Sequence, residues 1–129
     1  MRTLKSKVKV IIEKTSTGFS AYAKDYPVYT TGSNFTELFN NILEALNFYY
    51  EEKKIVVTPE NIDPAIDLKQ FFNYYKVLNS SYLAKRIGMN KTLLSQYVSG
   101  KKIPSSRQTK RIVEGVNEIG KELSEIQLV

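Results

Sequence analysis

A basic stretch without a single carboxylate is the part of this sequence whose side chains could act together on a ligand. Between Lys76 and Arg111 the chain carries nine lysines and arginines and no aspartate or glutamate. Residues 67–129 hold eleven basic and five acidic side chains, whereas residues 1–66 hold eight of each, so the whole net charge of +6 lies in the second half. Clustered cations favour an anionic partner, although a charge run can also be only a solvated surface.

Two missing residue types narrow the chemistry further. The 129-residue chain has no cysteine and no histidine, which removes disulfides, thiolate nucleophiles, cysteine zinc sites and imidazole bases. A nuclease would need several carboxylates converging on Mg²⁺. Glu13 and Asp25 are the acids to test for such a role, but nothing in the pattern brings three acids together. We therefore expect no enzymatic activity, no metal and no cofactor.

The first half shows the pattern of a small sheet. Apolar residues alternate along Val8–Ile12 and again along Phe19–Ala23, with a Ser-Thr-Gly turn ending at Gly18 between them. This period of two predicts a β-hairpin. A third short strand is expected over residues 28–31.

One helix and a last strand follow in the first half. Asn34 is a candidate N-cap for a helix over residues 35–52, whose apolar residues recur at helical spacing. Residues 55–57 predict a final short strand. The order β-β-β-α-β predicts an α+β domain over residues 1–58, with the Pro-containing residues 59–66 as a linker.

Three stretches of the first half resemble the N-terminal domain of HicB-type antitoxins: Gly18–Pro27, Thr31–Ser33 and Glu37–Leu46. The resemblance covers about residues 7–58. It implies a fold that is a truncated relative of ribonuclease H, and a domain that binds a small basic HicA-type toxin ribonuclease. The toxin-binding residues are unknown from the sequence; the sheet, the Lys24–Tyr29 loop and the helix surface are all open.

Residues 67–129 predict an all-α domain. A short helix places Leu83 inward, Gly88 permits a sharp turn, and Asn90 caps a second helix that Gly100 ends. Two short helices joined by a Gly-containing turn form a helix-turn-helix.

A final helix follows Pro104-Ser105. It carries an apolar stripe that includes Ile112, Leu123 and Ile126 and is expected to cover the core, while Gly115 and Gly120 weaken it and are candidate bends.

The run from Ser80 to Ser105 also resembles the helix-turn-helix of phage-repressor-like (Xre/Cro) regulators. The matching pairs are Leu83-Ala84, Ile87-Gly88, Leu94-Ser95, Gly100-Lys101 and Pro104-Ser105. In such motifs the second helix enters the major groove. The resemblance implies that the DNA base contacts come from Lys91, Thr92, Gln96, Asn90 and Ser95. It implies that the phosphate contacts come from Ser80, Ser81, Ser99, Lys101 and Lys102.

A helical bundle of the same shape that binds no DNA would explain the apolar positions but not the acid-free surface. We therefore expect DNA binding. Arg107, Lys110 and Arg111 would either extend the phosphate contact or only solvate the last helix, and the sequence leaves both open.

Together the two resemblances predict a cytoplasmic antitoxin that blocks its toxin and represses its own operon by binding a palindromic double-stranded operator. No segment is apolar and long enough for a membrane span. Because each domain is small, a homodimer or higher homo-oligomer is expected. The alternative is a stand-alone helix-turn-helix repressor whose first domain dimerises or senses another partner.

Overall fold

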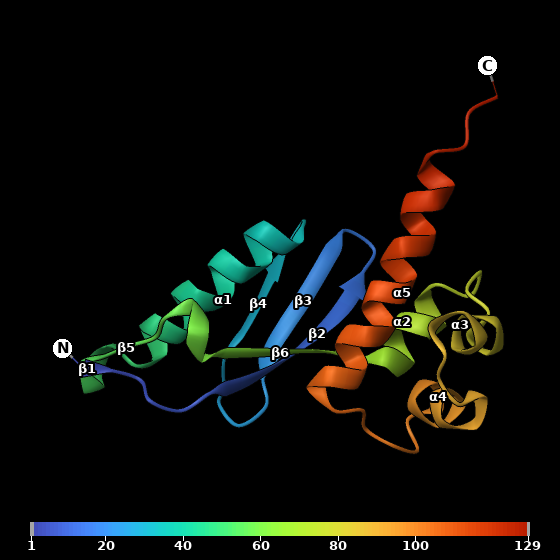
Figure 1. Cartoon of the computed structure of the whole chain (residues 1–129). Coiled ribbons are helices and arrows are strands. Elements are labelled where there is room, and N and C mark those ends of the chain that lie inside the picture. The colour runs from blue at the N-terminus through green and yellow to red at the C-terminus, as the bar shows by residue number, and fades with distance from the viewer. Residues whose placement is uncertain (1, 129) are drawn as a thin grey trace. The chain divides into compact units, whose positions relative to one another are not determined.

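The computed structural model describes residues 2–128, and the chain divides into two compact units, Met1–Asp67 and Leu68–Val129. Among the described residues, strands occur only in the first unit, and the second unit is helical (Figure 1). The chain is therefore a mixed α+β protein, as predicted. Within residues 2–128, no helix combines the length and the apolar character that crossing a membrane requires.

The first unit contains one α-helix, two short 3-10 helices and six strands among the described residues. They are β1 (Arg2–Thr3), β2 (Val8–Thr15), β3 (Gly18–Ala23), β4 (Tyr29–Gly32), α1 (Phe35–Tyr49), η1 (Glu51–Lys53), β5 (Ile55–Val56), η2 (Pro59–Asn61) and β6 (Ile62–Ile66). Four strands form the main sheet in the order β4-β3-β2-β6. β1 and β5 form a separate parallel pair.

The expected hairpin is the centre of the main sheet. β2 and β3 pair antiparallel with Ile12 opposite Ala21, and the alternation of β2 buries Val8, Val10 and Ile12. α1 packs on this sheet (Figure 1), and its own stripe buries Leu38, Ile42 and Leu46 against the strands. Each fully buried aliphatic side chain contributes about 1.5–3 kcal/mol, so this shared core holds the unit together.

The start of α1 is fixed by local hydrogen bonds, as the sequence predicts. The Asn34 Oδ1 accepts the backbone N–H of Glu37 at 2.9 Å, and the Ser33 hydroxyl donates to the Glu37 carboxylate at 2.7 Å. Gly32 stands where the end of β4 meets the helix, and a Cβ there would lie 2.5 Å from the backbone nitrogen of Leu38. Only glycine permits this approach of strand and helix.

The predicted linker over residues 59–66 is wrong. Residues 59–61 form η2 and residues 62–66 form β6, which pairs parallel with β2 and places Ile62 in the core. Pro64 is tolerated because β6 is an edge strand, where one row of backbone amides needs no partner. The predicted element order β-β-β-α-β therefore misses β1 and β6.

The tyrosines at the end of α1 pack in the core of the first unit. The rings of Tyr26, Tyr49 and Tyr50 contact one another, with centroids 5.1 to 5.8 Å apart. Burial raises the pKa of Tyr50 to about 12, and a hydrogen bond with Tyr26 adds to the shift. This cluster is a packing element.

The second unit consists of four α-helices among the described residues: α2 (Leu68–Tyr74), α3 (Ser80–Ile87), α4 (Lys91–Ser99) and α5 (Ser106–Ser124). Its buried apolar side chains come from all four helices and from the turn between α3 and α4. They are Leu68, Phe72, Leu83, Ala84, Met89, Leu94, Tyr97 and Ile112. In this small core α3 packs against α4 and α5, and α4 also packs against α2.

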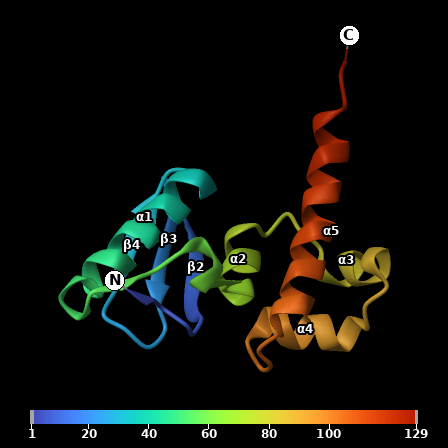
Figure 2. The same ribbon diagram turned by 60° about the vertical axis from the view of Figure 1, so that its left-hand side comes forward.

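α5 covers the core with its first half only. Gly115 is buried, and a Cβ on it would lie 2.4 Å from the Ile87 Cγ2, so this glycine lets α5 approach α3 closely. α5 is one continuous helix through Gly115 and Gly120, so the bends expected at these glycines are not present. Leu123 and Ile126 are exposed, and the second half of α5 extends beyond α3 and α4 (Figure 2), so the predicted core stripe ends before Leu123.

Candidate nucleic-acid interface

The turn between α3 and α4 is built by three residues. Gly88 ends α3 in the left-handed conformation with φ of 69°, which a side chain would disfavour. Met89 is buried and its N–H donates to the Ala84 carbonyl at 2.9 Å. Asn90 then caps α4, its Oδ1 accepting the Leu93 N–H at 3.0 Å. The result is two short helices joined by a three-residue turn.

α4 separates its polar and apolar side chains cleanly. At 100° per residue, Lys91, Thr92, Ser95, Gln96 and Ser99 fall within an arc of about 140°. The apolar residues Leu93, Leu94, Tyr97 and Val98 occupy the opposite side. Since Leu94 and Tyr97 are buried in the unit's core, the polar arc must point outward. A nine-residue helix is about 13 Å long, a size that a DNA major groove accepts.

The predicted base-contact residues lie on this arc or just before it. Lys91, Thr92 and Ser95 are exposed, and Gln96 is half-buried at the edge of the arc. Asn90 is exposed but its Oδ1 already caps α4, so only its amide nitrogen is left for a base. The arc therefore offers an ammonium donor, a hydroxyl with a methyl group, and an amide that donates and accepts.

The predicted phosphate-contact residues lie at two helix ends. Ser80 and Ser81 are half-buried in the first turn of α3, where unpaired backbone N–H groups attract anions. Ser99, Lys101 and Lys102 are exposed where α4 ends. The Ser99 hydroxyl donates to the Gln96 carbonyl at 3.3 Å, and the Lys102 N–H donates to the same carbonyl at 3.2 Å.

Two cations of the acid-free stretch have structural partners that the sequence did not indicate. The Arg111 guanidinium donates to the carbonyls of Ile87 and Gly88 at 2.8 and 2.9 Å, so it caps the C-terminal end of α3. Arg86 forms an ion pair with Glu122 of α5. Both pairings join residues more than 20 positions apart, and no local pattern could have revealed them.

The acids of the second unit lie on α5 or directly after it. Glu114, Glu118, Glu122 and Glu125 follow the acid-free stretch, and all are exposed. With four acids against eleven cations, residues 68–129 carry a net charge of +7. The field around α4 is therefore positive.

The two carboxylates considered for nuclease chemistry lie on different elements of the first unit. Glu13 is half-buried on β2, and Asp25 is exposed in the loop after β3. Within residues 2–128, no group of three or more histidine, cysteine, aspartate or glutamate residues is placed to hold a metal ion.

Comparison with known proteins adds no further information on function. A scan against protein-family models and searches of curated proteins and of solved structures find no match for this chain.

Proposed function

We propose that the second unit binds duplex DNA by placing the N-terminal part of α4 in the major groove. The observation that carries this proposal is the exposed polar arc of α4, which lies in a stretch of nine cations without an acid. A bundle that only packs would have no need to keep acids away from this surface. Lys91 would donate to guanine, Gln96 would pair with adenine, and the Thr92 methyl would contact thymine.

In this proposal Ser80, Ser81, Ser99, Lys101 and Lys102 hold the phosphate backbone and fix the register of α4 on the duplex. A helix-turn-helix protein of this kind reads a palindrome as a dimer, with half-sites about one helical turn apart. The proposed oligomer is therefore at least a homodimer.

The proposal extends to the first unit through its resemblance to HicB-type antitoxins. The stretches that carry the resemblance fall on β3, β4 and α1. On this basis the first unit binds a small basic toxin ribonuclease, and the second represses the operon that encodes both proteins in the cytoplasm. The function is occlusion and repression, with no catalysis, metal or cofactor.

DNA binding is tested by fluorescence anisotropy of the full chain with a duplex from its own upstream region and with a shuffled duplex. Lys91→Ala should weaken operator binding by about 1–3 kcal/mol and reduce specificity. Lys121→Ala removes the same charge from the exposed half of α5 and is the matched control; it should change little. Equal losses on both duplexes for Lys91→Ala would show that α4 is not the reading helix.

The antitoxin function is tested by co-expression with the product of the adjacent reading frame, followed by co-purification and a growth assay. Operator binding without a co-purifying small basic protein would favour the stand-alone repressor. Purified protein should not cleave RNA in the presence of Mg²⁺. Cleavage that is lost in Glu13→Ala or Asp25→Ala would replace the proposal with a nuclease.

A further inference from the structure

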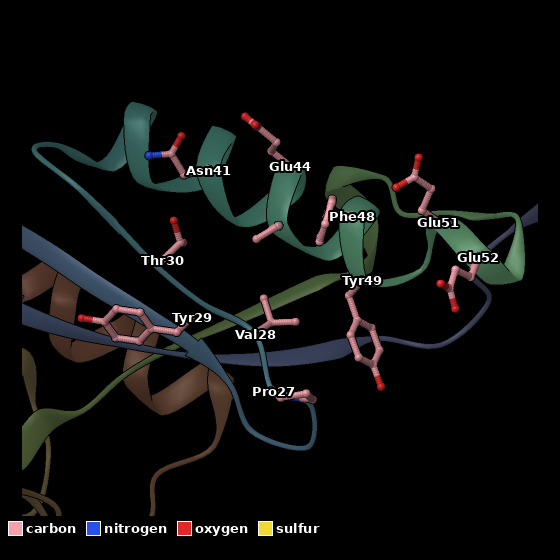
Figure 3. Close-up of a pocket in the computed structure, with 11 residues that line it drawn as sticks. Pro27, Val28, Tyr29, Thr30, Asn41, Glu44, Phe48, Tyr49, Glu51 and Glu52 are labelled. Atoms are coloured by element: carbon pink, nitrogen blue, oxygen red, sulfur yellow. The ribbon is translucent and has the colours of Figure 1, made fainter.

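A groove of about 660 Å³ runs between α1 and β4 in the first unit (Figure 3). Its strand side consists of Pro27, Val28, Tyr29 and Thr30, and its helix side includes Ala45, Phe48 and Tyr49. The groove is open to solvent. None of its residues belongs to the candidate nucleic-acid interface.

Two of the lining aromatic side chains are largely exposed. Tyr29 on β4 is 66% exposed and Phe48 on α1 is 78% exposed. Phe48 takes no part in the α1 stripe that buries Leu38, Ile42 and Leu46. Phe48 lies beside the strand edge, and an exposed aromatic ring in such a position is typical of an anchor that becomes buried when a protein partner binds.

The strand side of the groove is the open edge of the sheet. β4 has β3 on one side and no strand on the other among the described residues. The Ala23 N–H donates to the Val28 carbonyl at 2.9 Å. Because successive residues of an antiparallel strand direct their N–H and C=O groups to opposite sides, those of the next residue, Tyr29, point away from β3.

The far end of this edge is already covered. The Asn41 side chain of α1 donates to the Thr31 carbonyl at 2.8 Å. The open backbone is therefore short and centred on Tyr29, which suits two or three residues of an extended segment that adds to the sheet.

The charge of the groove selects among possible segments. Its lining holds three carboxylates, Glu44, Glu51 and Glu52, and no lysine or arginine (Figure 3). All three glutamates are exposed. An acidic extended segment would be repelled here, whereas lysine or arginine side chains on either side of an apolar residue would be attracted.

We propose that the groove between α1 and β4 binds a basic, extended segment of a partner protein. The segment adds to the edge of β4 at Tyr29, places an apolar side chain against Phe48 and Tyr49, and directs its cations toward Glu44, Glu51 and Glu52. The identification of this partner with the small basic toxin rests on the proposed function.

The test is an NMR titration of the full chain with the synthetic peptide Lys-Ser-Val-Ser-Lys-Ser, whose lysine and valine side chains lie on one face of an extended strand. We expect saturable shifts of the backbone amides of Tyr29, Thr30 and Phe48. A peptide with glutamate in place of lysine should not bind, and a peptide N-methylated at every residue should bind weakly because it has no backbone N–H to donate to the strand. Shifts that map elsewhere, no saturable shifts, or equal binding of the glutamate peptide would each overturn the proposal.

The charge contribution is isolated by the triple variant Glu44→Gln, Glu51→Gln, Glu52→Gln. Exposed ion pairs are individually weak, so the three together should raise the Kd of the lysine peptide about tenfold. The triple variant Glu114→Gln, Glu118→Gln, Glu125→Gln makes the same charge change on α5 and directly after it, and it should leave the Kd unchanged. Equal effects of the two triple variants would overturn the proposed role of the groove carboxylates.

The two proposals about the first unit can fail separately. Suppose that a neighbouring toxin co-purifies with Phe48→Ser and with the groove triple variant as well as it does with the native chain. In that case the groove proposal is overturned while the antitoxin function stands. If the lysine peptide binds at Tyr29 and Phe48 but no neighbouring toxin binds, the antitoxin function fails and the basic-segment site stands.

Discussion

The two units are nearly equal in length and differ sharply in charge. Residues 1–67 carry eight basic and nine acidic side chains, a net charge of −1, whereas residues 68–129 carry eleven basic and four acidic ones, a net charge of +7. The first unit offers a sheet edge and an acidic groove, and the second offers helix ends and the polar arc of α4 within a basic stretch. A single net charge of +6 for the whole chain hides this division, so the partner of each unit has to be inferred from its own surface.

Both units depend on small cores. A domain of about 60 residues buries only about 60% of the surface that its unfolded chain exposes, so its stability is marginal. In the first unit the core lies between α1 and the sheet, and in the second it lies among α2, α3, α4 and α5. One truncated core side chain should therefore unfold one unit.

The largest expected effect comes from such truncations. Leu94 in α4 and Leu46 in α1 are both fully buried. Leu94→Ala should destabilise the second unit by about 2–5 kcal/mol and abolish DNA binding, while Leu46→Ala should do the same to the first unit and abolish partner binding. The amide spectrum of each variant would show which unit has lost its native shifts.

The division into two separately folding units would be wrong if either substitution unfolded both units together. In that case the chain would be one cooperative domain despite its two cores. Val77→Ala is the matched control, since Val77 is 89% exposed and its truncation should leave both sets of native shifts unchanged.

Much of the fold could be predicted from local sequence patterns. The alternation along β2 and β3, the Asn34 cap of α1, and the Gly88 turn followed by the Asn90 cap are all present. Each of these features is encoded within a few residues, by side-chain period or by a single capping hydrogen bond. Local patterns were sufficient for them.

The features that were missed depend on contacts between distant residues. β6 was hidden by Pro64, because a proline is read as a break unless the strand is known to lie at a sheet edge. Leu123 was assigned to the core because helical spacing cannot show where the neighbouring helices end. The groove between α1 and β4 has no sequence signal at all, since its strand side and its helix side come together only in the folded unit.

A second prediction separates folding from DNA binding at one residue. Asn90→Ala should destabilise the second unit by about 1 kcal/mol, because the Leu93 N–H loses its cap. Asn90→Asp keeps a capping oxygen and the stability, but it places a carboxylate beside Lys91 in the acid-free stretch. It should weaken DNA binding while thermal unfolding is unchanged.

Anisotropy and thermal unfolding of the two variants provide the check. The proposed interface predicts that the aspartate variant is the weaker DNA binder and the alanine variant the less stable protein. An aspartate variant that binds DNA as tightly as the native chain would mean that the N-terminal end of α4 does not meet the duplex.

The smallest expected effect concerns a cation of the basic stretch that pairs with an acid. Arg86 is held by Glu122, and both side chains are partly exposed. Glu122→Gln should cost the second unit less than about 1 kcal/mol, because exposed ion pairs are weak. It would also free Arg86 for phosphate and raise the affinity for any duplex slightly, by about two- to threefold at low salt.

Glu118→Gln removes the same charge from the same helix without releasing Arg86, so an equal gain in that variant would mean that only the net charge matters. A gain confined to Glu122→Gln would place Arg86 at the edge of the DNA-binding surface and show that the acids of α5 limit how far this surface extends.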